Sequence, residues 1–222
     1  MNEVSKAAPT DCVILLHGLA RTERSMARLR RALERHGYCV INVGYDSRKG
    51  DVATLAEAAI APALEASADC GRIHFVTHSL GGILLRQFLA QHRIENLGRV
   101  VMLGPPNKGS EVVDRLRKVP GFHFINGDAG LELGTGEASL PNRLGPANFD
   151  LGIIAGTRSV NLILSTLIPG TDDGKVSVGN TQLEGMNDHI EMDVTHTFMM
   201  RNTGVIKQVI HYLETGKFER VD

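Results

Sequence analysis

Short apolar runs alternate with amphipathic stretches in the first half of the chain, and this alternation restricts the fold more than any other feature. The first run, residues 12–16, is apolar throughout, as in a strand that is buried on both faces. It ends at His17 and Gly18, and a helical pattern follows over residues 22–36. Strands that alternate with helices are typical of a parallel sheet covered by helices on both faces. The sequence therefore predicts an α/β fold.

The remaining predicted elements continue this order. Strands are expected near residues 38–43, 72–77, 99–103, 151–155 and 190–194, and helices near 51–67, 80–92, 110–118 and 202–215. Gly, Pro and Asn are frequent over 105–150, which we interpret as an irregular insert: either a lid or substrate-binding region, or a surface excursion. No repeat or linker divides the chain. Residues 1–222 are therefore interpreted as one domain, with about six mostly parallel strands.

Composition excludes several classes of function. The 222 residues include 24 basic and 25 acidic ones, so the net charge of −1 is not that of a typical nucleic-acid-binding protein. No apolar run is long enough to span a bilayer, and residues 1–11 lack the apolar segment of a signal peptide. We expect a cytoplasmic protein with no nucleic-acid partner and no transmembrane segment.

The cysteines do not indicate a disulfide framework. Cys12, Cys39 and Cys70 are few and odd in number, and their spacing is not that of a zinc site. Cys12 and Cys39 lie within apolar runs, so we expect buried thiols in a reducing compartment.

Two further patterns each have a favoured interpretation and an alternative. A basic stripe on the first helix is interpreted as a solvated face, and weak contact with an anionic lipid surface or an acidic partner is the alternative. The apolar stretch 159–168 is interpreted as core, and the lining of an apolar pocket is the alternative. The stripe consists of Arg21, Arg24, Arg28, Arg31 and Arg35.

A serine occupies the turn between the third predicted strand and the helix that follows. Residues 77–81 have the pattern small-x-Ser-x-Gly of a nucleophile elbow, in which small neighbours let strand and helix approach and the serine hydroxyl is exposed. Gly81 meets this requirement, and Thr77 stands where Gly is more usual. Ser79 is therefore the predicted nucleophile. An ordinary turn with Ser79 as helix N-cap is the alternative.

The loop after the first strand is expected beside Ser79, because the carboxyl ends of parallel strands lie at one edge of the sheet. Such a loop can aim a backbone N–H at a developing oxyanion, and the residue after the nucleophile supplies a second N–H. We therefore predict an oxyanion hole at Leu19 and Leu80, supported by His17 and Gly18. The alternative is a simple turn after a buried strand.

A serine nucleophile needs a base, and the base needs an orienting acid. Of the nine histidines, His196 is the best candidate because it follows the last predicted strand, at the same edge as Ser79. His189 is the alternative base or a supporting residue.

Two consecutive aspartates are candidates for the acid. We favour Asp173 over Asp172, because the following Gly174 leaves the turn free to present the carboxylate. An Asx turn is the alternative for either residue. Asp188 is a poorer candidate because it lies at the start of the last strand.

The ordered set of His17-Gly18, Ser79, Asp173 and His196 resembles the α/β-hydrolase family, and within it the small bacterial serine lipases and esterases. Three segments are also similar to parts of lipases. Residues 173–176 resemble the acid-bearing loop, 194–197 the histidine loop, and 106–110 a segment of lipase-like relatives. The resemblance extends from about residue 12 to residue 215.

This resemblance implies a minimal α/β-hydrolase fold, because only ten residues precede Asp11 and the full fold has two further leading strands. It also implies hydrolysis of a small-molecule or lipid ester through an acyl-enzyme, with no cofactor and no metal. An acyltransferase or thioesterase on the same fold, and a non-catalytic binding module, are the alternatives.

Overall fold

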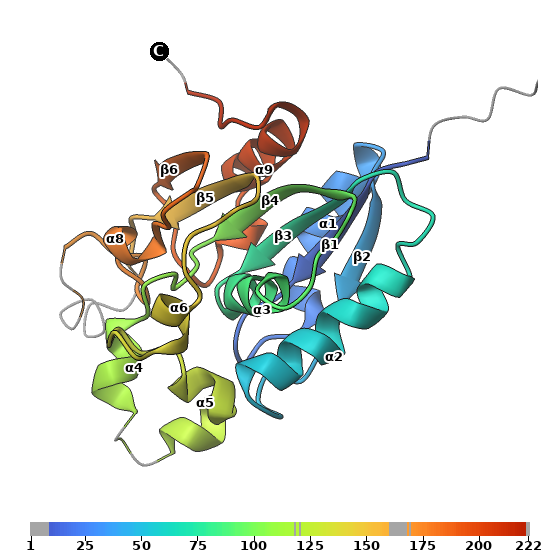
Figure 1. Cartoon of the computed structure of the whole chain (residues 1–222). Coiled ribbons are helices and arrows are strands. Elements are labelled where there is room, and N and C mark those ends of the chain that lie inside the picture. Colours follow the sequence, from blue (N-terminus) through green and yellow to red (C-terminus); the bar gives the residue numbers. More distant parts are fainter. Residues whose placement is uncertain (1–8, 118, 120, 160–167, 169, 221–222) are drawn as a thin grey trace, which may run out of the picture.

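The computed structural model describes residues 9–220 except 118, 120, 160–167 and 169. Within them the chain forms one six-stranded sheet of order β2-β1-β3-β4-β5-β6, in which all neighbouring strands are parallel (Figure 1). The predicted α/β fold with about six strands is thus confirmed. The strands are β1 (Cys12–Leu16), β2 (Cys39–Val43), β3 (Ile73–His78), β4 (Leu97–Leu103), β5 (Leu151–Gly156) and β6 (Asp188–Met192).

Helices cover both faces of the sheet. In Figure 1, α2 and α3 lie on one face, and α1 and α9 lie on the other. The helical elements are η1 (Glu23–Met26), α1 (Ala27–Arg35), α2 (Val52–Glu65), α3 (Leu80–Leu89), α4 (Glu111–Leu116), α5 (Phe122–Leu131), α6 (Leu140–Arg143), α8 (Val178–Thr181), η2 (Met199–Arg201) and α9 (Thr203–Thr215). The long helices α2 and α9 begin at side-chain N-caps, since Asp51 accepts from Thr54 N and Asn202 from Val205 N.

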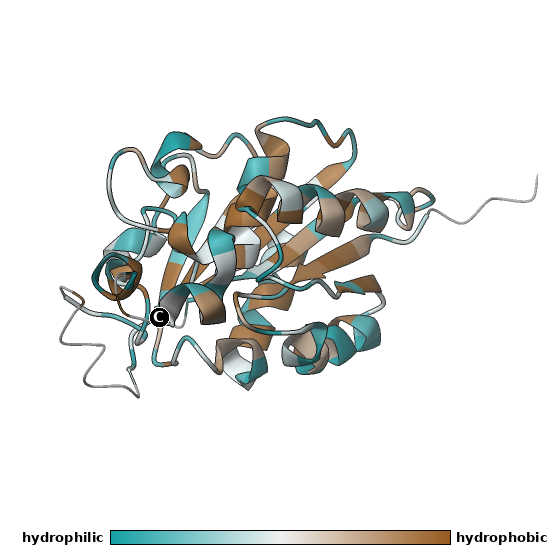
Figure 2. Cartoon of the chain, turned by 90° about the horizontal axis from the view of Figure 1, so that it is seen from below, coloured by the Kyte–Doolittle hydropathy of each residue, from teal (hydrophilic) through white to brown (hydrophobic). Residues whose placement is uncertain are grey.

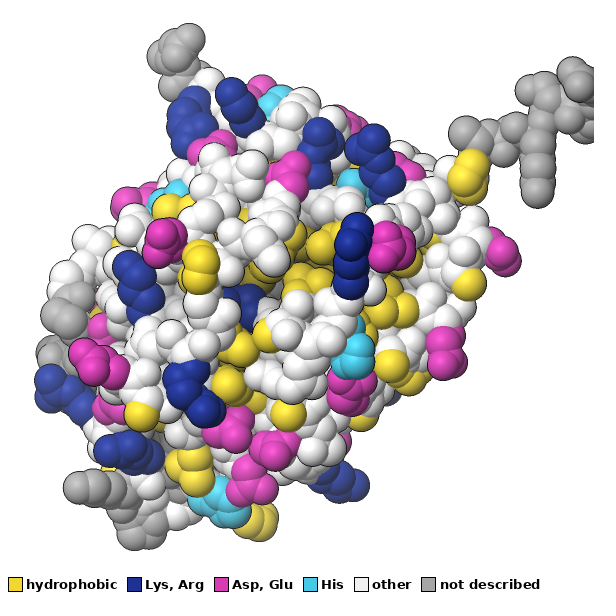
Figure 3. All heavy atoms as spheres, in the orientation of Figure 1, with side chains coloured by type: hydrophobic (Ala, Val, Ile, Leu, Met, Phe, Trp, Pro, Cys, Tyr) yellow, Lys and Arg dark blue, Asp and Glu magenta, His cyan; other side chains and the backbone are white. Residues whose placement is uncertain are grey.

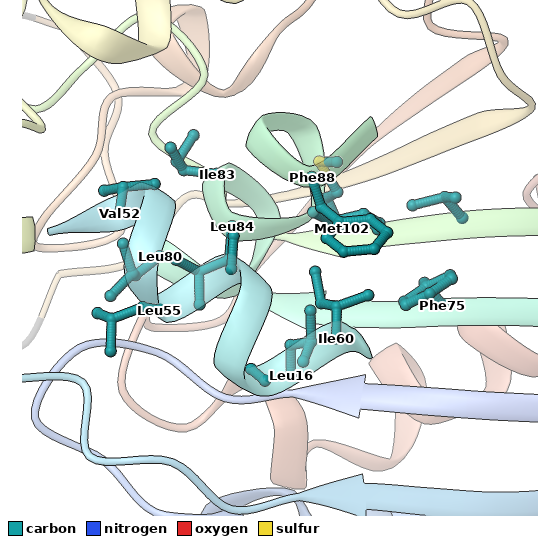
Figure 4. Packing of buried hydrophobic residues seen from close by; sticks show 14 of the residues in the cluster. Leu16, Val52, Leu55, Ile60, Phe75, Leu80, Ile83, Leu84, Phe88 and Met102 are labelled. Carbon is teal, nitrogen blue, oxygen red and sulfur yellow. The ribbon is translucent and has the colours of Figure 1, made fainter. Parts of the chain in front are cut away.

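The core lies on both sides of the sheet, which explains why β1 is apolar throughout. Ile14 and Leu16 belong to the cluster beneath α2 and α3, whereas Val13 and Leu15 belong to the cluster beneath α1 and α9. Burying each such side chain contributes about 1.5–3 kcal/mol. Figure 4 shows Leu16 and Phe75 of the sheet packed near α2 and α3, and Figure 2 shows that apolar residues concentrate in the strands.

Residues 105–150 contain more helix than predicted. Only the helix near 110–118 was expected, and the structure has α4, α5 and α6. Two of them are hard to detect in the sequence, because α6 has only four residues and α5 is interrupted at Gly127. There φ is 65°, and an added Cβ would lie 2.5 Å from the carbonyl oxygen of Arg48. These helices lie near the edge where the strands end (Figure 1).

The expectation that Cys12 and Cys39 are buried thiols is wrong. Cys12 and Cys70 form a disulfide, and Cys39 is free and exposed. The sequence conceals this arrangement, because Cys12 and Cys70 are 58 residues apart and only the fold brings them together. Most of the apolar stretch 159–168 lies outside the described residues.

The charged surface is mixed. Four arginines of the basic stripe are exposed, namely Arg24, Arg28, Arg31 and Arg35, whereas Arg21 lines a pocket. On the face seen in Figure 3, basic side chains are interspersed with acidic ones. No helix among the described residues is long and apolar enough to cross a membrane.

Candidate active site

Ser79 has a strained backbone conformation at the turn from β3 to α3. Its φ is 52° and its ψ is −120°, and Ala20 is the other non-glycine residue with positive φ in the described part of the chain. Such a conformation costs about 1–3 kcal/mol and is concentrated at functional sites. The Ser79 N–H donates to the carbonyl of Leu103 at 2.9 Å, and its side chain makes no N-cap hydrogen bond. The hydroxyl therefore has no capping role.

Two glycines after Ser79 allow the turn to be tight. A Cβ on Gly81 would lie 2.6 Å from the carbonyl oxygen of Leu16, so helix α3 could not approach β1 as closely. A Cβ on Gly82 would lie 3.3 Å from the Oγ1 atom of Thr77. Thr77, which is larger than the usual glycine, therefore packs against a residue that has no side chain.

The loop after β1 contacts the serine turn, as predicted from the sheet edge. A Cβ on Gly18 would lie 3.1 Å from the Cβ of Ser79 and 2.7 Å from His78 Nδ1. The backbone N–H groups of Leu19 and Leu80 have no hydrogen-bond acceptor within the described residues. Both are thus available to a ligand, and Leu19 lines the same pocket as Ser79.

His196 and Asp173 form a buried hydrogen-bonded pair. The Nδ1 atom of His196 lies 2.7 Å from Asp173 Oδ2, and the His196 backbone N–H donates to the Asp173 carbonyl at 3.0 Å. The other carboxylate oxygen of Asp173 accepts from the N–H groups of Lys175 and Val176 at 3.0 and 2.9 Å. The carboxylate is therefore held from both sides. Because Asp173 accepts at Nδ1, the neutral imidazole carries its lone pair on Nε2.

Asp172 has a different role in the same turn. Its Oδ1 atom accepts from the Gly174 N–H at 2.7 Å, which is an Asx turn, and its backbone bridges to Ser177. His189 and Asp188 lie at the start of β6. His189 Nε2 is 3.2 Å from Thr181 Oγ1, and Asp188 forms an ion pair with Arg220.

Gly104 was not recognised in the sequence. It follows β4 with φ of 53°, and a Cβ there would lie 2.9 Å from Asp173 Oδ2 and 3.1 Å from His196 Nδ1. The absence of a side chain therefore lets the pair sit against β4. A glycine immediately after a buried strand, at the edge that carries the site, is the signal that could have revealed it.

His78 was also missed as a supporting residue. Its Nε2 atom lies 2.9 Å from the His196 carbonyl oxygen, so Nε2 carries the proton and donates. Burial, and next the positive charge of His196 when protonated, hold the pKa of His78 well below its usual value. The side chain thus braces the histidine loop as a neutral donor.

His17 is held under the loop that carries Leu19. Its ring stacks on Tyr45 with centroids 4.0 Å apart, and its Nδ1 atom lies 2.9 Å from the Gly18 carbonyl oxygen. Burial lowers the pKa of His17, so it is a neutral structural support.

One pocket brings the serine, the histidine and the insert together. Ser79, His196, Arg21 and Lys175 all line it, and the charge of Asp173 acts on Lys175. No hydrogen bond joins Ser79 to the His196 ring among the described residues. The apolar lining of this pocket comes partly from residues 105–150. It consists of Leu19, Pro106, Val112, Val113, Leu133 and Val176.

Arg86 attaches the insert to α3, the helix that follows Ser79. This guanidinium is buried on α3 and donates to the backbone carbonyls of Asn107, Pro141 and Gly145 at 2.8–3.1 Å. Burial lowers the pKa of Arg86 to about 10. The pocket wall is therefore fixed to α3 by a charged group whose partners are carbonyl dipoles.

Comparison with known protein families decides the classification. A model described as the alpha/beta hydrolase family matches residues 13–172, which is more than half of the chain. The chain belongs to the alpha/beta hydrolase family. Its sheet order, serine turn and loop after β1 are thus features of this alpha/beta hydrolase.

Solved structures of low sequence identity share its fold. A lipase of Bacillus licheniformis in mature form has a TM-score of 0.73 at 20% identity, over 96% of each chain. An esterase of Pyrococcus furiosus has a TM-score of 0.63 at 18% identity, over 94% of this hydrolase and 82% of the esterase. A metagenomic carboxyl esterase has a TM-score of 0.61 at 20% identity, over 86% of this hydrolase and 65% of the esterase. No curated protein sequence matches significantly.

Proposed function

We propose that this alpha/beta hydrolase cleaves carboxylic esters as a serine esterase or lipase, through an acyl-enzyme on Ser79. One observation carries the proposal most strongly: the buried hydrogen bond of 2.7 Å between Asp173 and His196, whose imidazole faces the same pocket as Ser79. The strained turn at Ser79 adds support, because an exposed hydroxyl at such a turn is what nucleophilic attack requires.

The proposed mechanism assigns each group a role. His196 Nε2 takes the proton of Ser79 as the hydroxyl oxygen attacks the ester carbonyl, and Asp173 stabilises the imidazolium. The N–H groups of Leu19 and Leu80 hold the oxyanion. When the tetrahedral intermediate collapses, His196 protonates the leaving alcohol. Water then attacks the acyl-enzyme with His196 as base, and the acid product leaves.

The lining of the pocket suggests where the substrate binds. Its apolar residues from the insert, Val112, Val113 and Leu133, fit an acyl chain, so residues 105–150 act as the substrate-binding wall. Transfer of the acyl group to an alcohol, and hydrolysis of a thioester, use the same residues and are the alternative activities.

The test is hydrolysis of nitrophenyl esters of increasing chain length by the wild type and Ser79→Ala. We expect activity in the wild type and a loss of about 10⁴-fold or more in kcat in the variant. Repeating the assay with an acceptor alcohol and a thioester separates the alternatives by their products. Full activity of Ser79→Ala would remove the nucleophile assignment, and a wild type inactive on every substrate would favour a binding module.

A further inference from the structure

All three cysteines of the chain meet at one place, although the sequence separates them widely. The Sγ atoms of Cys12, Cys39 and Cys70 lie within 4.8 Å of one another. Cys12 and Cys39 are the first residues of β1 and β2 and are register partners, and Cys70 lies in the segment before β3. Cys12 and Cys70 are joined as a disulfide, and Cys39 is a free, exposed thiol.

Backbone hydrogen bonds bring these segments together without help from the disulfide. The Cys39 N–H donates to the Asp11 carbonyl at 3.1 Å, and the Cys12 N–H donates to the Arg72 carbonyl at 2.8 Å. The Asp11 carboxylate also accepts from the Arg72 N–H at 2.7 Å. The three sulfur atoms therefore remain neighbours when the disulfide is opened.

We propose that the reduced form of this cluster is a binding site for one thiophilic metal ion, such as Zn²⁺, held by three cysteine thiolates. A thiol or phosphine reductant supplies two electrons, the Cys12–Cys70 S–S bond breaks, and each sulfur gains a proton. The ion then replaces the protons of all three thiols. Thiolates are the ligands that select such ions. While Cys12 and Cys70 are joined as a disulfide, the site lacks two of its three thiolate ligands.

The observed spacing fits this ion. A Zn–S distance of about 2.3 Å in tetrahedral geometry places two sulfur atoms about 3.8 Å apart, which is within the span of the cluster. Cys12 is buried and Cys39 is exposed, so the site has an apolar base and an open side. Water is the expected fourth ligand on that side.

The site is separate from the proposed esterase chemistry. It lies at the amino ends of β1 and β2, whereas Ser79 and the loop after β1 lie at the carboxyl edge of the sheet. A bound ion would join β1, β2 and the segment before β3, so its expected effect is on stability. The outcome of its test is therefore independent of the outcome for ester hydrolysis.

The experiment is a Cd²⁺ titration of the whole chain, reduced with a phosphine and kept free of air, followed by thiolate-to-metal charge-transfer absorption. We expect one ion per reduced chain, with an absorption intensity of three thiolates, and no such band in the unreduced protein. The variant that tests the site is Cys39→Ser, which replaces the free, exposed thiol and keeps Cys12 and Cys70. It should bind Cd²⁺ at least about tenfold more weakly and with lower band intensity.

Unfolding provides a second measurement. Added Zn²⁺ should raise the Tm of the reduced wild type more than that of reduced Cys39→Ser, and a Cys70→Ser variant should resemble Cys39→Ser. Equal Cd²⁺ affinity and band intensity in the wild type and Cys39→Ser would overturn the proposal. So would the absence of a band in the reduced wild type.

Discussion

Asp173 and His196 are joined by a hydrogen bond of 2.7 Å while only 1% and 3% of their surfaces remain exposed. Water therefore cannot compete for the bond, and the imidazole is fixed in one orientation. The second oxygen of Asp173 accepts two backbone N–H groups of the same turn, so the carboxylate cannot rotate away. The adjacent Asp172 has the same chemistry but faces Gly174.

This difference makes the two aspartates a matched pair for mutation. Asp173→Asn should lower kcat for a nitrophenyl ester by about 10³–10⁴-fold, because the amide no longer fixes the imidazole tautomer. Asp172→Asn should change kcat by less than about tenfold, because its hydrogen bond to Gly174 does not involve His196. Steady-state kinetics of both variants, with circular dichroism to verify folding, decide the assignment. A larger loss in Asp172→Asn would reverse it.

Position 104 should not tolerate a side chain, because an added Cβ would be too close to Asp173 and His196. Gly104→Ala is expected to separate Asp173 from His196 and lower kcat by about 100-fold or more, with a destabilisation of about 1–3 kcal/mol from the positive φ. Gly179→Ala is the control, because a Cβ at that position meets no atom within 4 Å. Unfolding in urea and ester kinetics measure both effects. If the two variants behave alike, Gly104 has no special role.

Stability should decrease as pH falls from 7 to 5. Burial lowers the pKa of His17, His74 and His78 in the folded protein, whereas the unfolded chain takes up these protons near pH 6.5. Because the unfolded state then binds more protons, the free energy of unfolding rises with pH across this window. A histidine that stays neutral when folded contributes a slope of up to about 1.4 kcal/mol per pH unit below pH 6.5.

The contribution of His78 can be isolated by substitution. His78→Asn should flatten the dependence of the urea unfolding free energy on pH between 7 and 5. Gln91→Asn is the control, because it changes an exposed side chain and removes no titrating group, and it should retain the slope of the wild type. Equal slopes in the wild type and His78→Asn would show that His78 is protonated in the folded state.

The two cations at the pocket should favour esters that carry a negative charge. Arg21 and Lys175 line the same pocket, and burial, and next the positive charge of Arg21, lower the pKa of Lys175. Lys175→Met should lower the ratio of kcat/KM for an acyl chain ending in carboxylate to that for a neutral chain by about tenfold. Lys108→Met, at an exposed position that does not line the pocket, should leave the ratio unchanged.

The elements that could be predicted are those whose sequence pattern reflects local burial. β1 was predicted to its exact ends because both faces are covered. The last strand was predicted at 190–194 and is found at Asp188–Met192. As an edge strand it pairs only with β5, so its polar Asp188 and His189 are tolerated and the apolar pattern marks its ends poorly.

The site could be predicted in part for a similar reason. Ser79, Asp173 and His196 each follow a strand in the order typical of the family, so the residues themselves carry a signal. Three other features join segments that are distant in sequence: the contact of Gly104 with Asp173 and His196, the hydrogen bond from His78, and the meeting of the cysteines. A single sequence contains no distances between such segments, and the folded structure is needed to reveal them.

The guanidinium of Arg86 fixes both ends of residues 105–150 to α3. Its acceptors at Asn107, Pro141 and Gly145 lie near the two ends of the insert, and the stretch between them makes none of these bonds. Exchange of Val112, which lines the pocket without belonging to the core cluster beneath α2 and α3, would therefore change the pocket while the ends stay anchored to α3. New substrate preferences can arise there, by evolution or by design, without reconstruction of the serine turn.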